Sequence, residues 1–173
     1  MNQAKTKSTT FRIVIAGLLA ALTCVATMLI RIPTLKGYIH IGDSMVIASG
    51  ILLGPMTGGF AAGIGSMLAD ILSGYPAFSI ATLVIKFLAA ASAGLLYHLL
   101  SDRLKKHVVF STIFSGLLSE IVVVVGYFVF EIFYEGFAAA LAEIVPNGIQ
   151  GAVALFLAVF LIPTLKHSLK DLR

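Results

Sequence analysis

Three polar side chains share one face of a long apolar segment. Glu120, Tyr127 and Glu131 are spaced seven and four residues apart within residues 108–133, which are otherwise rich in Val and Phe. At 100° per residue, these side chains fall within a strip about 40° wide on a helix. Carboxyls and a phenol on such a face offer hydrogen-bonding groups to a ligand. The alternative is that they hydrogen-bond to neighbouring helices, and this alternative is weakest for Glu120, near the middle of the segment.

Other polar residues accompany this stripe. Asn147 and Gln150 lie three residues apart in the first turn of an expected helix over residues 146–165. Asn147 can cap that helix, whereas Gln150 has no capping role. Asp70 and Lys86 flank one turn, so we expect an ion pair between them in preference to direct ligand contact.

These residues define a candidate pocket for a small, planar, polar ligand. His40 and Tyr75 lie in loops on the same side and could close over it, while Glu120 is expected mainly to hold helices together. The candidate ligand-binding residues are His40, Tyr75, Lys86, Tyr127, Glu131, Asn147 and Gln150.

The sequence offers little that indicates enzyme chemistry. It contains no GxxxxGK[ST] phosphate loop, no HExxH or GxSxG motif and no arrangement for a cysteine nucleophile. Cys24 is the sole cysteine, and no Cys/His spacing fits a metal site. We therefore expect no catalytic residues, no bound metal and no cofactor.

The elements that position these groups are apolar. Hydrophobic residues make up 59% of the 173 residues, charged residues make up 12%, and the mean hydropathy is +1.03. Soluble domains carry about 25% charged residues, so the lipid bilayer must solvate part of this surface. We predict one all-α domain over residues 1–173, an integral membrane bundle of six transmembrane helices. The expected helices cover residues 11–30, 44–53, 57–72, 79–100, 108–133 and 146–165.

The distribution of Lys and Arg predicts the orientation. Six crossings place nine basic residues on the side of the two termini and two on the other side, with Lys86 inside a helix. Both termini should therefore be cytoplasmic. Because the basic residues cluster at helix ends, the pI near 9.3 indicates membrane orientation rather than binding of nucleic acid.

Small residues four apart predict close helix packing. The pairs Gly50/Gly54, Gly59/Gly63 and Ala90/Gly94 are interpreted as contacts within the bundle. Ala16 and Ala20, like Gly17 and Ala21, are flanked by Leu and Ile and could face lipid or another subunit.

Several stretches together resemble the substrate-binding S components of energy-coupling factor (ECF) vitamin transporters, over nearly the whole chain. They are residues 37–44 (GYIHIGDS), 54–58 (GPMTG), 69–70 (AD), 73–75 (SGY), Thr82 and 85–86 (IK), together with the Ala16/Ala20 face. The six-helix layout and the length also match.

The resemblance implies a multi-pass protein of a prokaryotic plasma membrane that binds a water-soluble vitamin from outside. The loop after the first helix would act as a lid, and toppling of the subunit in the bilayer would bring the site inside. Ala16 and Ala20 would dock onto a transmembrane coupling subunit that works with two ATPase subunits.

Within the family, the sequence looks closest to the riboflavin, pyridoxine and hydroxymethylpyrimidine branch. The chain lacks the tryptophans typical of thiamine binders, which argues against thiamine. Pyridoxine or hydroxymethylpyrimidine is the favoured ligand and riboflavin the next. The alternatives are a structural or regulatory membrane subunit without a ligand, and a stand-alone secondary transporter. The latter usually needs more helices and an inverted repeat.

Overall fold

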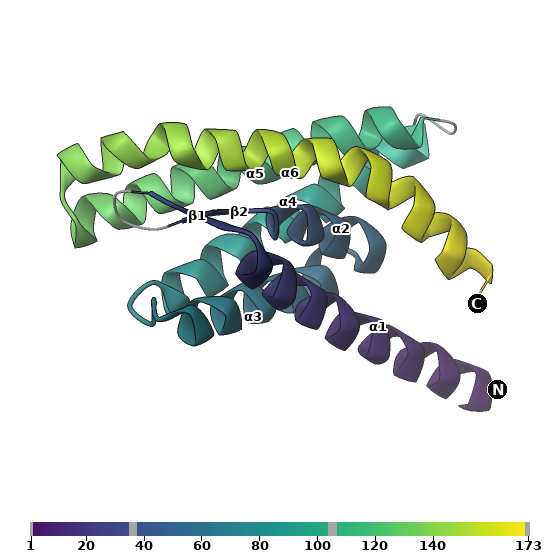
Figure 1. The fold of residues 1–173 in the computed structure, drawn as a ribbon. Helices are drawn as coiled ribbons and strands as arrows, with labels where there is room; N and C mark the ends of the chain where they lie inside the picture. The colour runs from purple at the N-terminus through teal and green to yellow at the C-terminus, as the bar shows by residue number, and fades with distance from the viewer. Residues whose placement is uncertain (1, 35–37, 104–106, 172–173) are drawn as a thin grey trace.

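The computed structural model describes residues 2–34, 38–103 and 107–171, and within them six helices and one short hairpin (Figure 1). The elements are α1 (Asn2–Leu29), β1 (Arg31–Pro33), β2 (Tyr38–His40), α2 (Asp43–Leu53), α3 (Pro55–Ser73), α4 (Ser79–Arg103), α5 (Val108–Tyr134) and α6 (Phe137–Asp171). The all-helical prediction is therefore confirmed, with the addition of the hairpin, which the sequence indicated only as a loop.

The start of α6 was predicted wrongly. The helix begins at Phe137 instead of residue 146, so Pro146 lies inside it and Asn147 cannot be its N-cap. Residues 138–142 are mostly alanine, which favours helix and extends it ahead of the proline. The break from α5 falls instead at Gly136, whose φ of 94° suits glycine.

Four of the described helices are long and apolar enough to cross a membrane, namely α1, α4, α5 and α6. The prediction of six spanning helices is corrected accordingly. The 11 residues of α2 reach only about 16 Å at 1.5 Å per residue. The 19 residues of α3 are long enough, but its many small residues lower its hydropathy.

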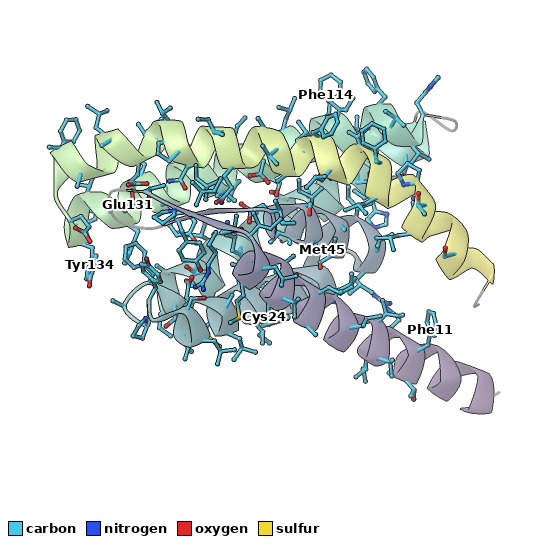
Figure 2. All side chains as sticks on the ribbon, in the orientation of Figure 1. Phe11, Cys24, Met45, Phe114, Glu131 and Tyr134 are labelled. Atoms are coloured by element: carbon cyan, nitrogen blue, oxygen red, sulfur yellow. The ribbon has the colours of Figure 1, made fainter. Side chains whose placement is uncertain are left out.

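The surface of the bundle is nevertheless apolar around α3 as well. Met56, Phe60, Ile64 and Leu68 repeat every four residues and are all at least 41% exposed, while the opposite face of α3 buries glycine and alanine. In Figure 2, apolar side chains such as Phe114 project outward from the ribbon. A small inner face and a large apolar outer face are what lipid contact requires.

Helix α2 lies at the centre of the bundle, in contact with α1, α3, α4 and α6. Figure 1 shows α5 and α6 as a long antiparallel pair with the hairpin beside it; β2 contacts α6 and α1, and α4 packs directly on α5. Both described chain ends lie at one end of the bundle. The hairpin and the α3–α4 and α5–α6 turns lie at the other end.

Glycines bring α2, α3 and α4 into close contact, as the spacing of small residues predicted. A Cβ added to Gly50 would collide with the Ala90 carbonyl of α4, and one added to Gly94 would collide with the Gly50 carbonyl. Additions at Gly59 and Gly63 would also run into α4. Gly50, the Gly59/Gly63 pair and the Ala90/Gly94 pair therefore pack within the bundle, whereas Gly54 lies at the break between α2 and α3 with a φ of 84°.

The hairpin carries the chain into the bundle. Its strands are antiparallel, with Arg31 opposite His40 and Pro33 opposite Tyr38. Irregular backbone at this depth must be satisfied by protein groups. The Gly42 amide donates to His40 Nδ1 at 3.1 Å, and the Ser44 amide donates to the Ile41 carbonyl at 3.2 Å. Hydrogen bonds to neighbouring residues thus satisfy the backbone just before α2 begins.

Candidate functional site

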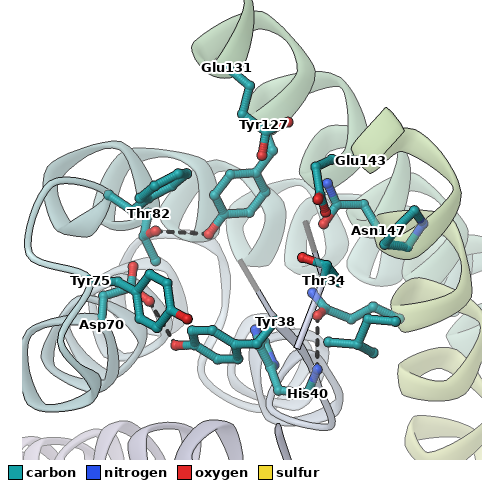
Figure 3. Close-up of a pocket in the computed structure, with 14 residues that line it drawn as sticks. Thr34, Tyr38, His40, Asp70, Tyr75, Thr82, Tyr127, Glu131, Glu143 and Asn147 are labelled. Carbon is teal, nitrogen blue, oxygen red and sulfur yellow. Dashed lines mark hydrogen bonds between the residues drawn. The ribbon is translucent and has the colours of Figure 1, made fainter. Parts of the chain in front are cut away.

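A polar chamber lies at the hairpin end of the bundle (Figure 3). It is open on one side: water-sized molecules can fill about 50 Å³ of it, and the whole space between its walls, including the open mouth, is about 500 Å³. The lining residues are Thr34, Tyr38, Ile39, His40, Asp70, Tyr75, Phe78, Thr82, Tyr127, Glu131, Glu143, Pro146, Asn147 and Gln150.

Five parts of the chain build this chamber. The hairpin covers one side, the end of α3 and the α3–α4 turn form a second, and α4, α5 and α6 form the rest. Six of the seven ligand-binding residues predicted from sequence line it: His40, Tyr75, Tyr127, Glu131, Asn147 and Gln150. The stripe on α5 thus faces the interior, and the extra turns of α6 add Glu143.

Lys86, the seventh predicted residue, lies behind the chamber and does not line it. Its side chain is fully buried, and Nζ lies 2.6 Å from Asp43 Oδ1. The expected Asp70–Lys86 ion pair is therefore wrong. Asp43 takes this place because the hairpin carries it inward to the first turn of α2, where a helix N-terminus favours negative charge.

Gln150 completes a network under the chamber. Its Nε2 donates to Asp43 Oδ2 at 2.7 Å, and its Oε1 accepts from the His40 amide at 3.0 Å. Both Asp43 oxygens are thus hydrogen-bonded, as a fully buried charge requires. The network ties α2, α4, α6 and the hairpin together, so Gln150 affects the site through its protein partners.

Tyr38 and Asp70 link the hairpin to α3, and the sequence analysis placed neither of them in the site. The Tyr38 hydroxyl donates to Asp70 Oδ1 at 2.9 Å. The Tyr38 ring centroid lies 5.0 Å from that of Tyr75 and 5.5 Å from that of His40. Burial and the Asp70 carboxyl raise the pKa of Tyr38, which keeps its donor proton. The sequence signal that could have identified Tyr38 was its place in the segment GYIH, in which polar and apolar side chains alternate.

Tyr127 forms the opposite wall of the chamber. Its hydroxyl is 2.8 Å from Thr82 Oγ1, and its ring lies 5.1 Å from Lys86 Nζ. Both contacts hold the ring in place. The chamber therefore has aromatic side chains on two sides, contributed by Tyr38 and Tyr127 (Figure 3).

His40 is neutral at physiological pH. The pKa of its imidazole is lowered to about 4, chiefly by burial; nearby Asp43 partly opposes this change, and Lys86 adds to it. Nδ1 accepts from the Gly42 amide, so Nε2 carries the proton. Within the described residues, no cluster of His, Cys, Asp and Glu could hold a metal ion.

Two further predicted features lie away from the chamber. Glu120 is buried at the edge of an apolar groove between α5 and α6, beside Gly151. Ala16 and Ala20 are half-buried and pack against the cluster of Leu19, Leu53 and Ala61. Their docking role stays a prediction.

Comparison with known proteins shows which family and which solved structure this chain resembles. Residues 7–167 match the family described as ECF-type riboflavin transporter, S component. A solved structure described as the S component of a bacterial ECF transporter superposes with a TM-score of 0.66 at 24% identity, covering 94% of this chain and 99% of that one. This likeness shows the fold.

A curated relative from Pyrococcus woesei, described as an uncharacterized protein in a gap 3′ region, is 52% identical over 64 residues. The match covers 36% of this chain and 43% of that protein, so it spans less than half of the relative. The family match covers nearly the whole chain. The chain therefore belongs to the family of ECF-type riboflavin transporter S components.

Proposed function

We propose that this chain is the substrate-binding subunit of an ECF importer and that its chamber binds a small heteroaromatic vitamin. The observation that carries the proposal is the chamber itself, in which the rings of Tyr38 and Tyr127 flank hydrogen-bonding groups. Aromatic faces suit a planar ring, and the few convergent polar groups fix its orientation.

Two sizes of ligand are candidates. A single ring, as in pyridoxine or hydroxymethylpyrimidine, is favoured by the small volume of the chamber. Riboflavin is the second candidate, and the description of the matching family favours it. Its larger ring system would extend into the open mouth of the chamber.

The hairpin is proposed to act as the lid. The volume of about 50 Å³ that small molecules can fill has room for only a few water molecules, so we expect the chamber to widen when a vitamin binds. The hairpin is held by a few hydrogen bonds, including Tyr38 to Asp70 and the His40 amide to Gln150. Breaking these bonds would let the hairpin move aside and admit the ligand.

Mass spectrometry of small molecules retained by the purified chain tests the proposal. We expect a heteroaromatic vitamin in the wild-type protein and loss of most of it in Tyr127→Leu, which removes one aromatic wall. Phe114→Leu, on the outer surface, is the matched control and should retain the ligand. No retained vitamin, together with no binding of pyridoxine, hydroxymethylpyrimidine or riboflavin by calorimetry, would favour a structural or regulatory subunit.

The proposed partners are a transmembrane coupling subunit and two ATPase subunits, and the proposed location is the plasma membrane with both termini in the cytoplasm. Ser101 lies near the C-terminal end of α4 and Tyr134 at the C-terminal end of α5, and these positions lie at opposite ends of the bundle. A single cysteine would be placed at each position in a Cys24→Ala background. Impermeant thiol reagents should label the Tyr134 position from outside intact cells and the Ser101 position only after lysis. The reverse pattern would invert the orientation.

A further inference from the structure

We propose that the chamber selects ligands that carry a positive charge on or beside the heteroaromatic ring. This inference rests on the proposed function and specifies the class of its substrate. It follows from which charged groups line the chamber and from how their atoms are paired.

Acidic side chains dominate the charge of the chamber. Among the residues that the structure describes, the lining includes Asp70, Glu131 and Glu143 and no Lys or Arg. His40 adds no charge because it is neutral. A ligand in the chamber therefore meets carboxyl groups from α3, α5 and α6 together.

The nearest basic groups do not neutralise these acids. Lys86 is fully buried and paired with Asp43 at 2.6 Å, so this pair is neutral as a unit. Arg31 is exposed on β1, with its guanidinium 5.7 Å from the centroid of the Tyr38 ring. It does not line the chamber.

Two of the three carboxyls keep an oxygen without a hydrogen-bond partner. Asp70 uses Oδ1 for Tyr38 and leaves Oδ2 unpaired, and Glu131 leaves Oε2 unpaired. The residues are only 7% and 5% exposed, respectively. Buried acceptors of this kind are costly unless a donor reaches them. Because they line the chamber, a bound ligand is positioned to supply that donor.

A cationic donor satisfies these groups better than a neutral one. An ammonium or a protonated ring nitrogen supplies both the hydrogen bond and the opposite charge, and such bonds are roughly twice as strong as neutral ones. An anionic ligand would add repulsion to the carboxyls.

A matched series of pyridine derivatives tests this selection. Calorimetry at pH 7.5 on the full chain in detergent would compare pyridoxamine, pyridoxine and 4-pyridoxate, which share a ring but differ in side-group charge, with riboflavin as a neutral tricycle. We expect pyridoxamine to bind at least about tenfold more tightly than pyridoxine, which corresponds to about 1.4 kcal/mol. 4-Pyridoxate should bind most weakly of the three.

The Glu131→Gln variant removes one charge at nearly constant shape. Its affinity for pyridoxamine should fall about tenfold, while its affinity for pyridoxine should change by less than about threefold. Glu135→Gln, one turn away and outside the lining, is the control and should keep the wild-type preference.

The outcomes separate the two proposals. Binding of pyridoxine or riboflavin as tight as that of pyridoxamine would overturn charge selection and leave the vitamin-binding function standing. An unchanged preference in Glu131→Gln and in Asp70→Asn would likewise overturn it. Failure of every probe to bind the wild-type chain would overturn the proposed function and this inference with it.

Discussion

The buried pair of Lys86 and Asp43 allows a quantitative prediction. Replacing Lys86 by Met keeps the length of the side chain but removes the charge 2.6 Å from Asp43, and both side chains are fully buried. Breaking such a pair typically costs about 3–5 kcal/mol, because the remaining charge is left unpaired.

Protonation of Asp43 limits this loss. A carboxyl with an ordinary pKa of about 3.9 can be protonated at pH 7 for about 4 kcal/mol, and at pH 5 for about 1.5 kcal/mol. In the variant, the folded state binds this proton and the unfolded state does not, so its stability falls as pH rises. The destabilisation of Lys86→Met should therefore grow from about 1.5 to about 4 kcal/mol between pH 5 and pH 7.

Unfolding titrations with SDS in mixed micelles, followed by circular dichroism at both pH values, would measure this difference. The double variant Asp43→Asn/Lys86→Met removes both charges and should recover most of the stability with little pH dependence. Lys166→Met is the control, because Lys166 donates to the Tyr97 hydroxyl and is not paired with a buried carboxylate. An equal loss at pH 5 and pH 7 in Lys86→Met would refute the reasoning.

Three further predictions concern other parts of the molecule. Asn147→Ala should weaken binding of the retained vitamin by about 5- to 150-fold in calorimetry, because one hydrogen-bonding partner in the lining is lost; wild-type affinity would place the site elsewhere. Leu at both Ala16 and Ala20 should abolish co-purification with the coupling subunit while vitamin binding persists, whereas Gly17→Ala, whose added methyl meets nothing within 4 Å, should keep the complex. Because the pKa of His40 falls to about 4 on folding, the unfolded state binds more protons below pH 6.5; stability should drop from pH 6.5 towards pH 4, and less steeply in His40→Gln.

The polar stripe on α5 illustrates what local spacing can predict. Glu120, Tyr127 and Glu131 share a face because the helical period fixes their directions, and the apolar residues around them make that face the inner one. The same period identified the small-residue contacts of α2, α3 and α4. These features depend on neighbours in sequence and needed no knowledge of the fold.

The hairpin illustrates the opposite case. Its two strands are three residues each, too short for a periodic signal, and their pairing depends on the whole connection between α1 and α2. Without it, Asp43 fell just before the helix expected over residues 44–53, and Lys86 was assigned to Asp70. In the structure, the hairpin reaches inward and places Asp43 between Lys86 and Gln150.

The sequence by itself therefore determined the helical membrane class, the inner faces of the long helices and most of the lining on α5 and α6. Only the tertiary structure decided which acid pairs with Lys86, that Tyr38 and Asp70 join the hairpin to α3, and that Glu143 enters the chamber. Faces follow from a fixed rotation per residue along one helix. Partners depend on contacts between residues 32 to 110 positions apart, and the packing of the entire bundle sets these distances.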